Sequence, residues 1–130
     1  MIVTDASAIV QACLSKVDLK QLASHELIAP PLLWSEATSV IHELKWRRQI
    51  SAQLAVAAFD KLKEAPVRLR RPADLQAEAW RLAERFGWAK TYDAEYVALA
   101  RLSKCRLLTT DAKLAAVAKQ VVDVVGPSDL

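Results

Sequence analysis

The chain begins Met1-Ile2-Val3-Thr4-Asp5-Ala6-Ser7, where a short β-branched run meets an aspartate. Ile, Val and Thr favour extended backbone, and the segment from Ala6 to Leu14 continues with helix-compatible Ala, Ile, Val and Leu. We therefore predict a strand, then Asp5, then a helix. This unit decides the fold because strand and helix alternate through most of the chain.

A second unit of this kind comes after a polar stretch. The apolar run Leu27–Ala29 is closed by Pro30 and Pro31. These prolines cannot continue a strand interior, but they can open a helix because its first N–H groups need no partner. In the helix after these prolines, a core stripe is predicted at Leu33, Ala37, Val40, Ile41 and Leu44.

The rest of the chain continues the alternation. Further helices are predicted over residues 51–64, 72–86, 93–104 and 112–119, and further strands over residues 67–70, 106–109 and 121–125. In the helix over 51–64, Leu54, Ala58 and Leu62 share the predicted buried face. The strands are short and apolar and no hairpin turns join them. We therefore expect an α/β fold, a three-layer α/β/α sandwich with a central, mostly parallel sheet, in a single domain over residues 1–130.

The composition agrees with one compact domain, and the absence of targeting and membrane signals bears on where the protein is found. The 130 residues are 53% hydrophobic, with no repeat or low-complexity run. The N-terminus lacks the features of a signal peptide, and no apolar run is long enough to cross a bilayer. We expect a soluble, cytoplasmic protein with no membrane partner. A formal net charge of +3 and a pI near 9.0 mildly favour a polyanionic partner.

The cysteines and glycines argue against several classes of metal-binding and nucleotide-binding protein. Cys13 and Cys105 show no metal-binding spacing and are predicted to be free thiols. Gly87 and Gly126 are the only glycines, so the sequence contains neither a P-loop nor a dinucleotide-binding fingerprint. The segment Asp5-Ala6-Ser7 also lacks the second aspartate of a haloacid-dehalogenase-like phosphatase.

Three aspartates are predicted to meet at one edge of the sheet. Asp5 and Asp111 each follow a strand and precede a helix, and Asp93 opens a helix in the same alternating pattern. Each alone is more often a helix cap, but like charges gathered together require a cation or a proton. Glu36, near the start of the helix after the second strand, can join them. Carboxylates without His or Cys favour Mg²⁺ or Mn²⁺ over zinc, and such an ion can activate water.

Other charged residues have less specific interpretations. Glu95 lies two residues after Asp93, which turns it about 200° around the helix, so it is predicted to face solvent. Basic residues form three groups: Lys45, Arg47 and Arg48; Lys61 and Lys63; Arg68, Arg70 and Arg71. Most such groups are solvated helix faces. A group that flanks the acidic edge would contact nucleic-acid phosphates.

The ordered motifs resemble those of a known family over nearly the whole chain. They are Met1–Ser7, Ser35-Glu36, Tyr92-Asp93-Ala94 with Ala98-Leu99-Ala100, and Leu107–Asp111. This order resembles PIN-domain ribonucleases, specifically VapC-type toxins. The resemblance implies endonucleolytic cleavage of RNA that depends on Mg²⁺ or Mn²⁺. It also implies a cognate antitoxin protein that blocks the acidic site, and a homodimer.

The resemblance also implies roles for individual residues. Its acidic quartet falls on Asp5, Glu36, Asp93 and Asp111. Asp5 and Asp93 resemble the principal metal ligands, and Glu36 and Asp111 complete the site directly or through metal-bound water. Ser7 and Thr109 are similar to the hydroxyl residues that support the ligands from behind.

Two alternatives remain open from the sequence. The acidic pocket of a catalytically silent PIN-like module would bind basic residues of a protein partner. A nuclease with the same site would instead cut structured DNA. Cleavage assays on RNA and DNA at one Mg²⁺ concentration separate these alternatives.

Overall fold

The computed structural model describes residues 1–16 and 19–130, and its centre is a five-stranded sheet. The strand order is β3-β2-β1-β4-β5, and every neighbouring pair is parallel. The strands are β1 (Ile2–Thr4), β2 (Leu27–Ala29), β3 (Val67–Leu69), β4 (Arg106–Leu108) and β5 (Val124–Val125). The predicted parallel sheet is therefore confirmed.

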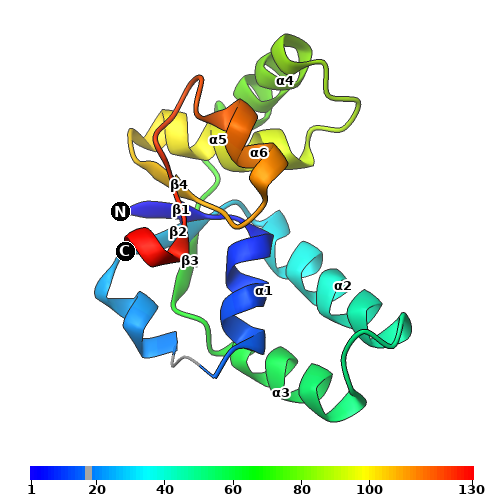
Figure 1. Cartoon of the computed structure of the whole chain (residues 1–130). Coiled ribbons are helices and arrows are strands. Elements are labelled where there is room, and N and C mark those ends of the chain that lie inside the picture. The colour runs from blue at the N-terminus through cyan, green and yellow to red at the C-terminus, as the bar shows by residue number, and fades with distance from the viewer. Residues whose placement is uncertain (17–18) are drawn as a thin grey trace.

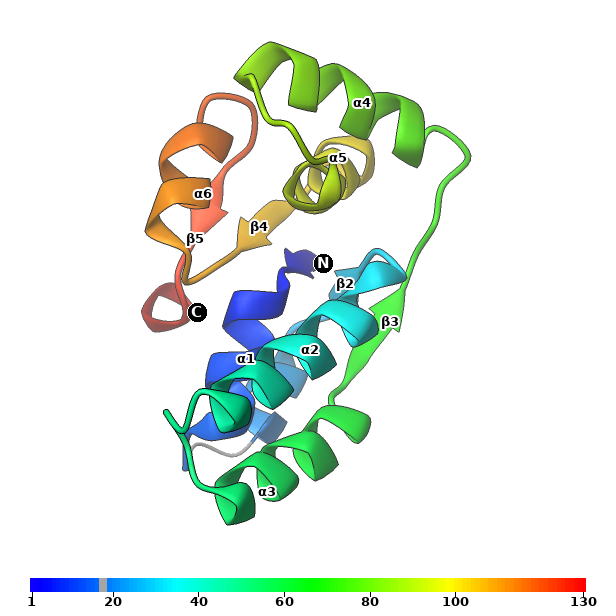
Figure 2. The same cartoon turned by 90° about the vertical axis from the view of Figure 1, so that its right-hand side faces the viewer.

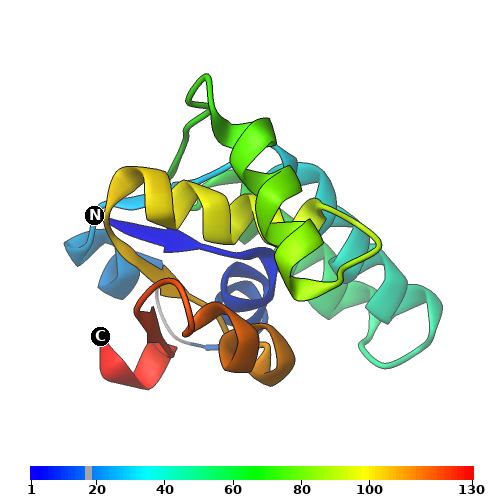
Figure 3. The same cartoon turned by 90° about the horizontal axis from the view of Figure 1, so that it is seen from above.

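Helices cover both faces of the sheet, which confirms the three-layer prediction. They are α1 (Ala6–Leu14), α2 (Leu32–Trp46), α3 (Ala52–Lys63), α4 (Leu75–Phe86), α5 (Tyr92–Ser103) and α6 (Ala112–Ala118), with 3₁₀ segments η1 (Leu19–Ser24) and η2 (Pro127–Asp129). Helices α1, α2 and α3 pack together on one side, and α4, α5 and α6 lie on the other (Figures 1 and 2). Seen from above, these last three helices lie in front of the sheet (Figure 3).

The core runs through the sheet into α5. Strands β1 and β2 are buried along their whole length, as expected for strands covered on both faces. Helix α5 is buried at Ala94 and at every residue from Tyr96 to Ala100, because it packs between α4 and the sheet. Helix α5 is therefore part of the core, and its first turn, which carries Asp93, lies at the carboxyl edge of the strands.

Several element boundaries differ from the predictions. Helix α4 begins at Leu75 rather than residue 72, since Pro72 opens a turn whose carbonyl accepts from the Leu75 N–H at 3.0 Å. Strand β5 is shorter than predicted because the Val121 and Val122 N–H groups both donate to the Ala118 carbonyl. Leu54 is 38% exposed, so its predicted burial is wrong.

Other predictions agree with the structure. Cys13 and Cys105 are free thiols, and burial raises the pKa of Cys13 to about 11. Helix α4 ends at Gly87, which adopts φ +69°, a left-handed conformation open to glycine. Across residues 1–16 and 19–130, every helix is too short or too polar to span a membrane. The polar stretch predicted over residues 15–24 contains η1, and its residues 17 and 18 lie outside the described part.

Candidate functional site

The order of the strands reverses between β1 and β4, and Asp5 lies at this switch point. The chain passes from β1 outward to β2 and β3, then returns to place β4 on the other side of β1. The Asp5 N–H donates to the Leu108 carbonyl at 3.1 Å, which joins the carboxyl ends of β1 and β4. In open α/β sheets, ligands bind at such a point.

Asp5 is buried, and hydrogen-bond donors surround its carboxylate. Its Oδ1 accepts from the Ser7 hydroxyl at 2.8 Å and from the Ala8 N–H at 3.0 Å, and its Oδ2 accepts from the Thr109 hydroxyl. The two hydroxyls lie 3.2 Å apart. Ser7 and Thr109 therefore fix the Asp5 carboxylate from behind, as a supporting role requires.

Burial nevertheless dominates the ionisation of Asp5. Removal from water raises its pKa, and these three hydrogen bonds only partly oppose that effect. The negative charge of Asp111 raises it further. Asp5 is also the N-cap of α1, so the capping interpretation is confirmed, and capping leaves the carboxylate at the switch point of the sheet.

Asp111 caps a helix and still presents a free oxygen. Its Oδ1 accepts from the Lys113 N–H at 2.9 Å and from the Leu114 N–H at 3.1 Å. Its own N–H donates to the Thr109 hydroxyl at 3.0 Å. Within the described residues its Oδ2 accepts no hydrogen bond, and it lies at the exposed rim.

Asp93 does not cap its helix. Thr91 is the N-cap residue of α5, and the Asp93 carboxylate accepts no hydrogen bond from any described residue. Its side chain lies at the exposed rim, yet neighbouring atoms displace enough water to raise its pKa. The charge of Asp111 raises this pKa further. The carboxylate is therefore free to bind a ligand.

Glu36 reaches the same site from the opposite layer, through a hydrogen bond to Tyr96. The Tyr96 hydroxyl donates to Glu36 Oε1 at 3.2 Å. Burial raises the pKa of Glu36, the Tyr96 hydrogen bond lowers it, and the charges of Asp93, Asp5 and Glu95 raise it. These couplings bring all four members of the predicted quartet into one electrostatic group.

Sequence reasoning missed Tyr96. The only signal in the sequence is a hydroxyl within an otherwise apolar helical stripe, one turn after Asp93. Its hydroxyl faces a carboxylate inside the protein, so burial and the Glu36 charge raise the pKa of Tyr96. It remains a neutral donor.

Glu95 is predicted to face solvent, and the structure shows it only partly exposed. Glu95 is half-buried, and its charge contributes to the raised pKa of Glu36. Gln76 Nε2 donates to Glu95 Oε1 at 3.1 Å. Burial raises the pKa of Glu95, whereas the Gln76 hydrogen bond and the charge of Arg71 lower it. Glu95 lies in the first turn of α5, where its hydrogen bond to Gln76 of α4 reduces its exposure without burying it.

The donor atoms suit a hard divalent cation. The group offers carboxylate oxygens, and no positive side chain in the described residues contributes to the pKa values of Asp5, Glu36 or Asp93. Among those residues, no group of three or more His, Cys, Asp or Glu side chains is already arranged to hold a metal ion. Mg²⁺ does not require one, because it keeps several waters and commonly binds through one or two carboxylates.

One of the predicted basic groups flanks this edge. Arg70 and Arg71 follow the carboxyl end of β3, and the Arg70 N–H donates to the Ala29 carbonyl at 2.8 Å. Arg71 is close enough to Glu95 to lower its pKa. The third member, Arg68, instead lies 3.6 Å from a carboxylate oxygen of Glu26.

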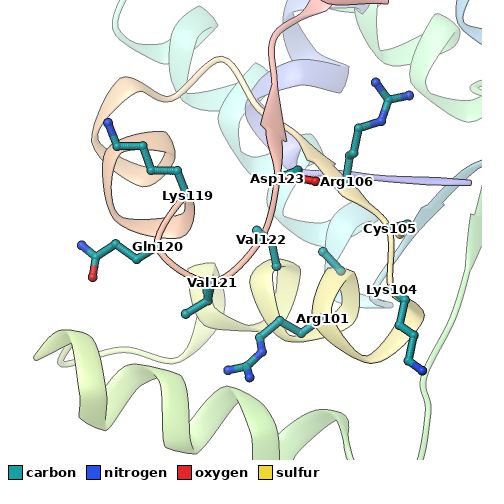
Figure 4. A pocket seen from close by; sticks show the side chains of 10 residues that line it. Arg101, Lys104, Cys105, Arg106, Lys119, Gln120, Val121, Val122 and Asp123 are labelled. Carbon is teal, nitrogen blue, oxygen red and sulfur yellow. The ribbon is translucent and has the colours of Figure 1, made fainter.

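A second group of basic side chains surrounds a cavity at the other edge of the sheet. This cavity of about 510 Å³ lies where β4 and β5 begin. Figure 4 shows that Arg101, Lys104, Arg106 and Lys119 extend in different directions, with Asp123 beside Arg106. These cations do not converge on one point, and the cavity is separate from the acidic site.

Known proteins share both the sequence and the fold of this chain. The family described as PIN domain matches residues 2–120. Ribonuclease VapC9 of Mycobacterium tuberculosis is 33% identical over 115 residues, which cover 88% of each chain. The crystal structure of PAE2754 from Pyrobaculum aerophilum is 25% identical, with a TM-score of 0.70 over 94% of this chain and 87% of that one. The VapBC2 structure from Rickettsia felis, bound to a promoter DNA fragment, shares the fold with a TM-score of 0.63 and 15% identity, covering 97% and 98%.

Proposed function

Because this chain belongs to the PIN-domain family, we propose that it is an endoribonuclease of the VapC type, the toxin of a toxin–antitoxin pair. The observation that carries the proposal is the acidic group at the switch point of the sheet. Asp5, Glu36 and Asp93 have raised pKa values with no described cation to compensate them. Such a group is poised to bind a metal ion.

Asp5 and Asp93 would be the principal ligands of Mg²⁺ or Mn²⁺. Asp93 has an unengaged carboxylate at the rim, and Asp5 is held in one orientation by Ser7 and Thr109. Asp111 and Glu36 each offer an oxygen without a described hydrogen bond, suited to water bound by the ion. When bound, the ion supplies water activation and neutralises charge on the scissile phosphate.

An antitoxin partner and a homodimer complete the proposal. No positive side chain among the described residues contributes to the pKa values of Asp5 or Asp93, so a basic residue from a partner would neutralise these carboxylates and block metal binding. This chemistry agrees with an inhibitor that occupies the metal site. Size measurements on the free chain would test the dimer separately.

Cleavage of a pool of cellular RNAs tests the proposal most directly. We expect cleavage with Mg²⁺ or Mn²⁺, none with excess EDTA, and none by Asp93→Asn, which removes no described hydrogen bond of the fold. Asp123→Asn is the matched control, because this exposed aspartate lies at the opposite edge of the sheet. Undiminished cleavage in EDTA, or by Asp93→Asn, would refute the metal-dependent mechanism. Cleavage of DNA but not of RNA would refute the proposal that RNA is the substrate.

A further inference from the structure

Tyr96 is a fully buried side chain with one polar atom, and that atom contacts the acidic site. Its relative exposure is 0%, so the ring belongs to the core. The hydroxyl makes one described hydrogen bond, to Glu36 Oε1 at 3.2 Å. A Phe at this position would fill the core equally well, so packing alone does not explain the hydroxyl.

This hydrogen bond joins helices from two different layers. Helix α5 lies on one side of the sheet and α2 on the other (Figure 2). Tyr96 follows Asp93 by one turn, so the buried helix that presents Asp93 also contacts Glu36. The two acids are thereby fixed relative to each other.

The contact also orients the Glu36 carboxylate. Glu36 is half-buried on a helix flank, where its long side chain has several rotamers. With Oε1 bound to the hydroxyl, Oε2 is left without a described hydrogen bond. One oxygen is anchored, and the other is available to the ion or its water.

We propose that Tyr96 is a positioning residue that holds Glu36 for metal binding. This inference rests on the proposed metal-dependent function. It distinguishes two roles for the tyrosine. A core residue would affect folding only, whereas a positioning residue would affect metal affinity through Glu36 and through no other group.

The test measures Mn²⁺ affinity by calorimetry, together with RNA cleavage. Removing the hydroxyl in Tyr96→Phe should weaken Mn²⁺ binding by about tenfold, as expected for a hydrogen bond to a charged group. In a Glu36→Gln background the same change should have no further effect on Mn²⁺ affinity. Tyr92→Phe, at an exposed tyrosine that starts α5, is the matched control and should bind Mn²⁺ like the parent.

A second variant tests the contact from its other side and leaves the core intact. Glu36→Asp keeps the carboxylate but shortens the side chain by one methylene, which separates it from the Tyr96 hydroxyl. It should weaken Mn²⁺ binding about as much as Tyr96→Phe. Circular dichroism and Tm establish that each variant is folded before it is titrated.

Two outcomes would overturn the inference. One is Mn²⁺ affinity within about twofold of the parent in Tyr96→Phe. The other is an equal loss of affinity from Tyr96→Phe with and without Glu36→Gln. If the parent binds Mn²⁺ with the expected coupling but cleaves no RNA, the positioning role stands and the ribonuclease proposal fails.

Discussion

Asp5 shows how one side chain combines a structural and a chemical task. It caps α1 through Oδ1, accepts the Thr109 hydroxyl through Oδ2, and is 3% exposed. The hydrogen bonds favour its ionised form, but burial outweighs them, so its pKa is raised. The folded, metal-free protein therefore holds a proton at this site more tightly than the unfolded chain does.

The pH dependence of stability follows from that sign. A carboxyl whose pKa is raised on folding destabilises the fold at neutral pH, and the cost disappears as pH falls through the raised pKa. In EDTA, Asp5→Asn should therefore have a Tm at pH 7 equal to or above that of the parent. This difference should shrink as pH falls toward about 4, the ordinary pKa of aspartate.

Thermal unfolding of the two proteins across this pH range provides the measurement. The comparison isolates Asp5 because every other titrating group is common to both chains. If the Tm of Asp5→Asn lies below that of the parent at pH 7 and at every other pH measured, the lost hydrogen bonds outweigh the effect of removing the charge. The variant should also lose RNA cleavage by about a hundredfold or more.

At the scale of elements, the site depends on the residues directly after each strand. The residues after β1 and β4 supply acids and hydroxyls, and the residues after β3 supply Arg70 and Arg71. Within the described residues, neither arginine forms a salt bridge. Arg68, on the same strand, pairs with Glu26. The end of β3 thus places two cations that form no described salt bridge beside the acidic group.

We predict that these cations contact the RNA backbone. The double charge reversal Arg70→Glu and Arg71→Glu should lower kcat/KM by about tenfold or more and reduce its dependence on salt. Arg68→Glu is the control, since this arginine is already paired. Cleavage rates measured over a range of KCl concentrations provide the comparison. Equal losses in both variants would indicate a general effect of net charge instead.

Local sequence patterns predicted most elements but could not predict contacts between them. The β-branched run before Asp5 and the apolar run before Thr109 identify strands, and each following Asp marks a helix start. Helical spacing places Tyr96 in the core, but it contains no information about Glu36, sixty positions away. The contact between Glu95 and Gln76 of α4 is equally absent from the sequence pattern of α5.

Over the whole molecule, the acidic group lies where both helix layers meet the carboxyl ends of β1 and β4. Asp5 comes from the middle of the sheet, Glu36 from one layer, and Asp93 and Asp111 from the other. Repulsion among these carboxylates opposes the association of the layers in the metal-free protein. A bound cation would replace this repulsion with attraction, so metal binding and global stability are coupled.

Addition of Mn²⁺ or Mg²⁺ should therefore raise the Tm of the parent chain. An ion that binds only the folded state stabilises it by about 2.7 kcal/mol at one hundred times its Kd, which corresponds to roughly 10 °C for a domain of this size. Asp93→Asn should lose this shift, because its carboxylate accepts no described hydrogen bond and is available to the ion. Asp123→Asn should keep it. Differential scanning calorimetry with and without metal measures the shift, and an unchanged parent Tm at saturating ion would contradict a metal site built from these carboxylates.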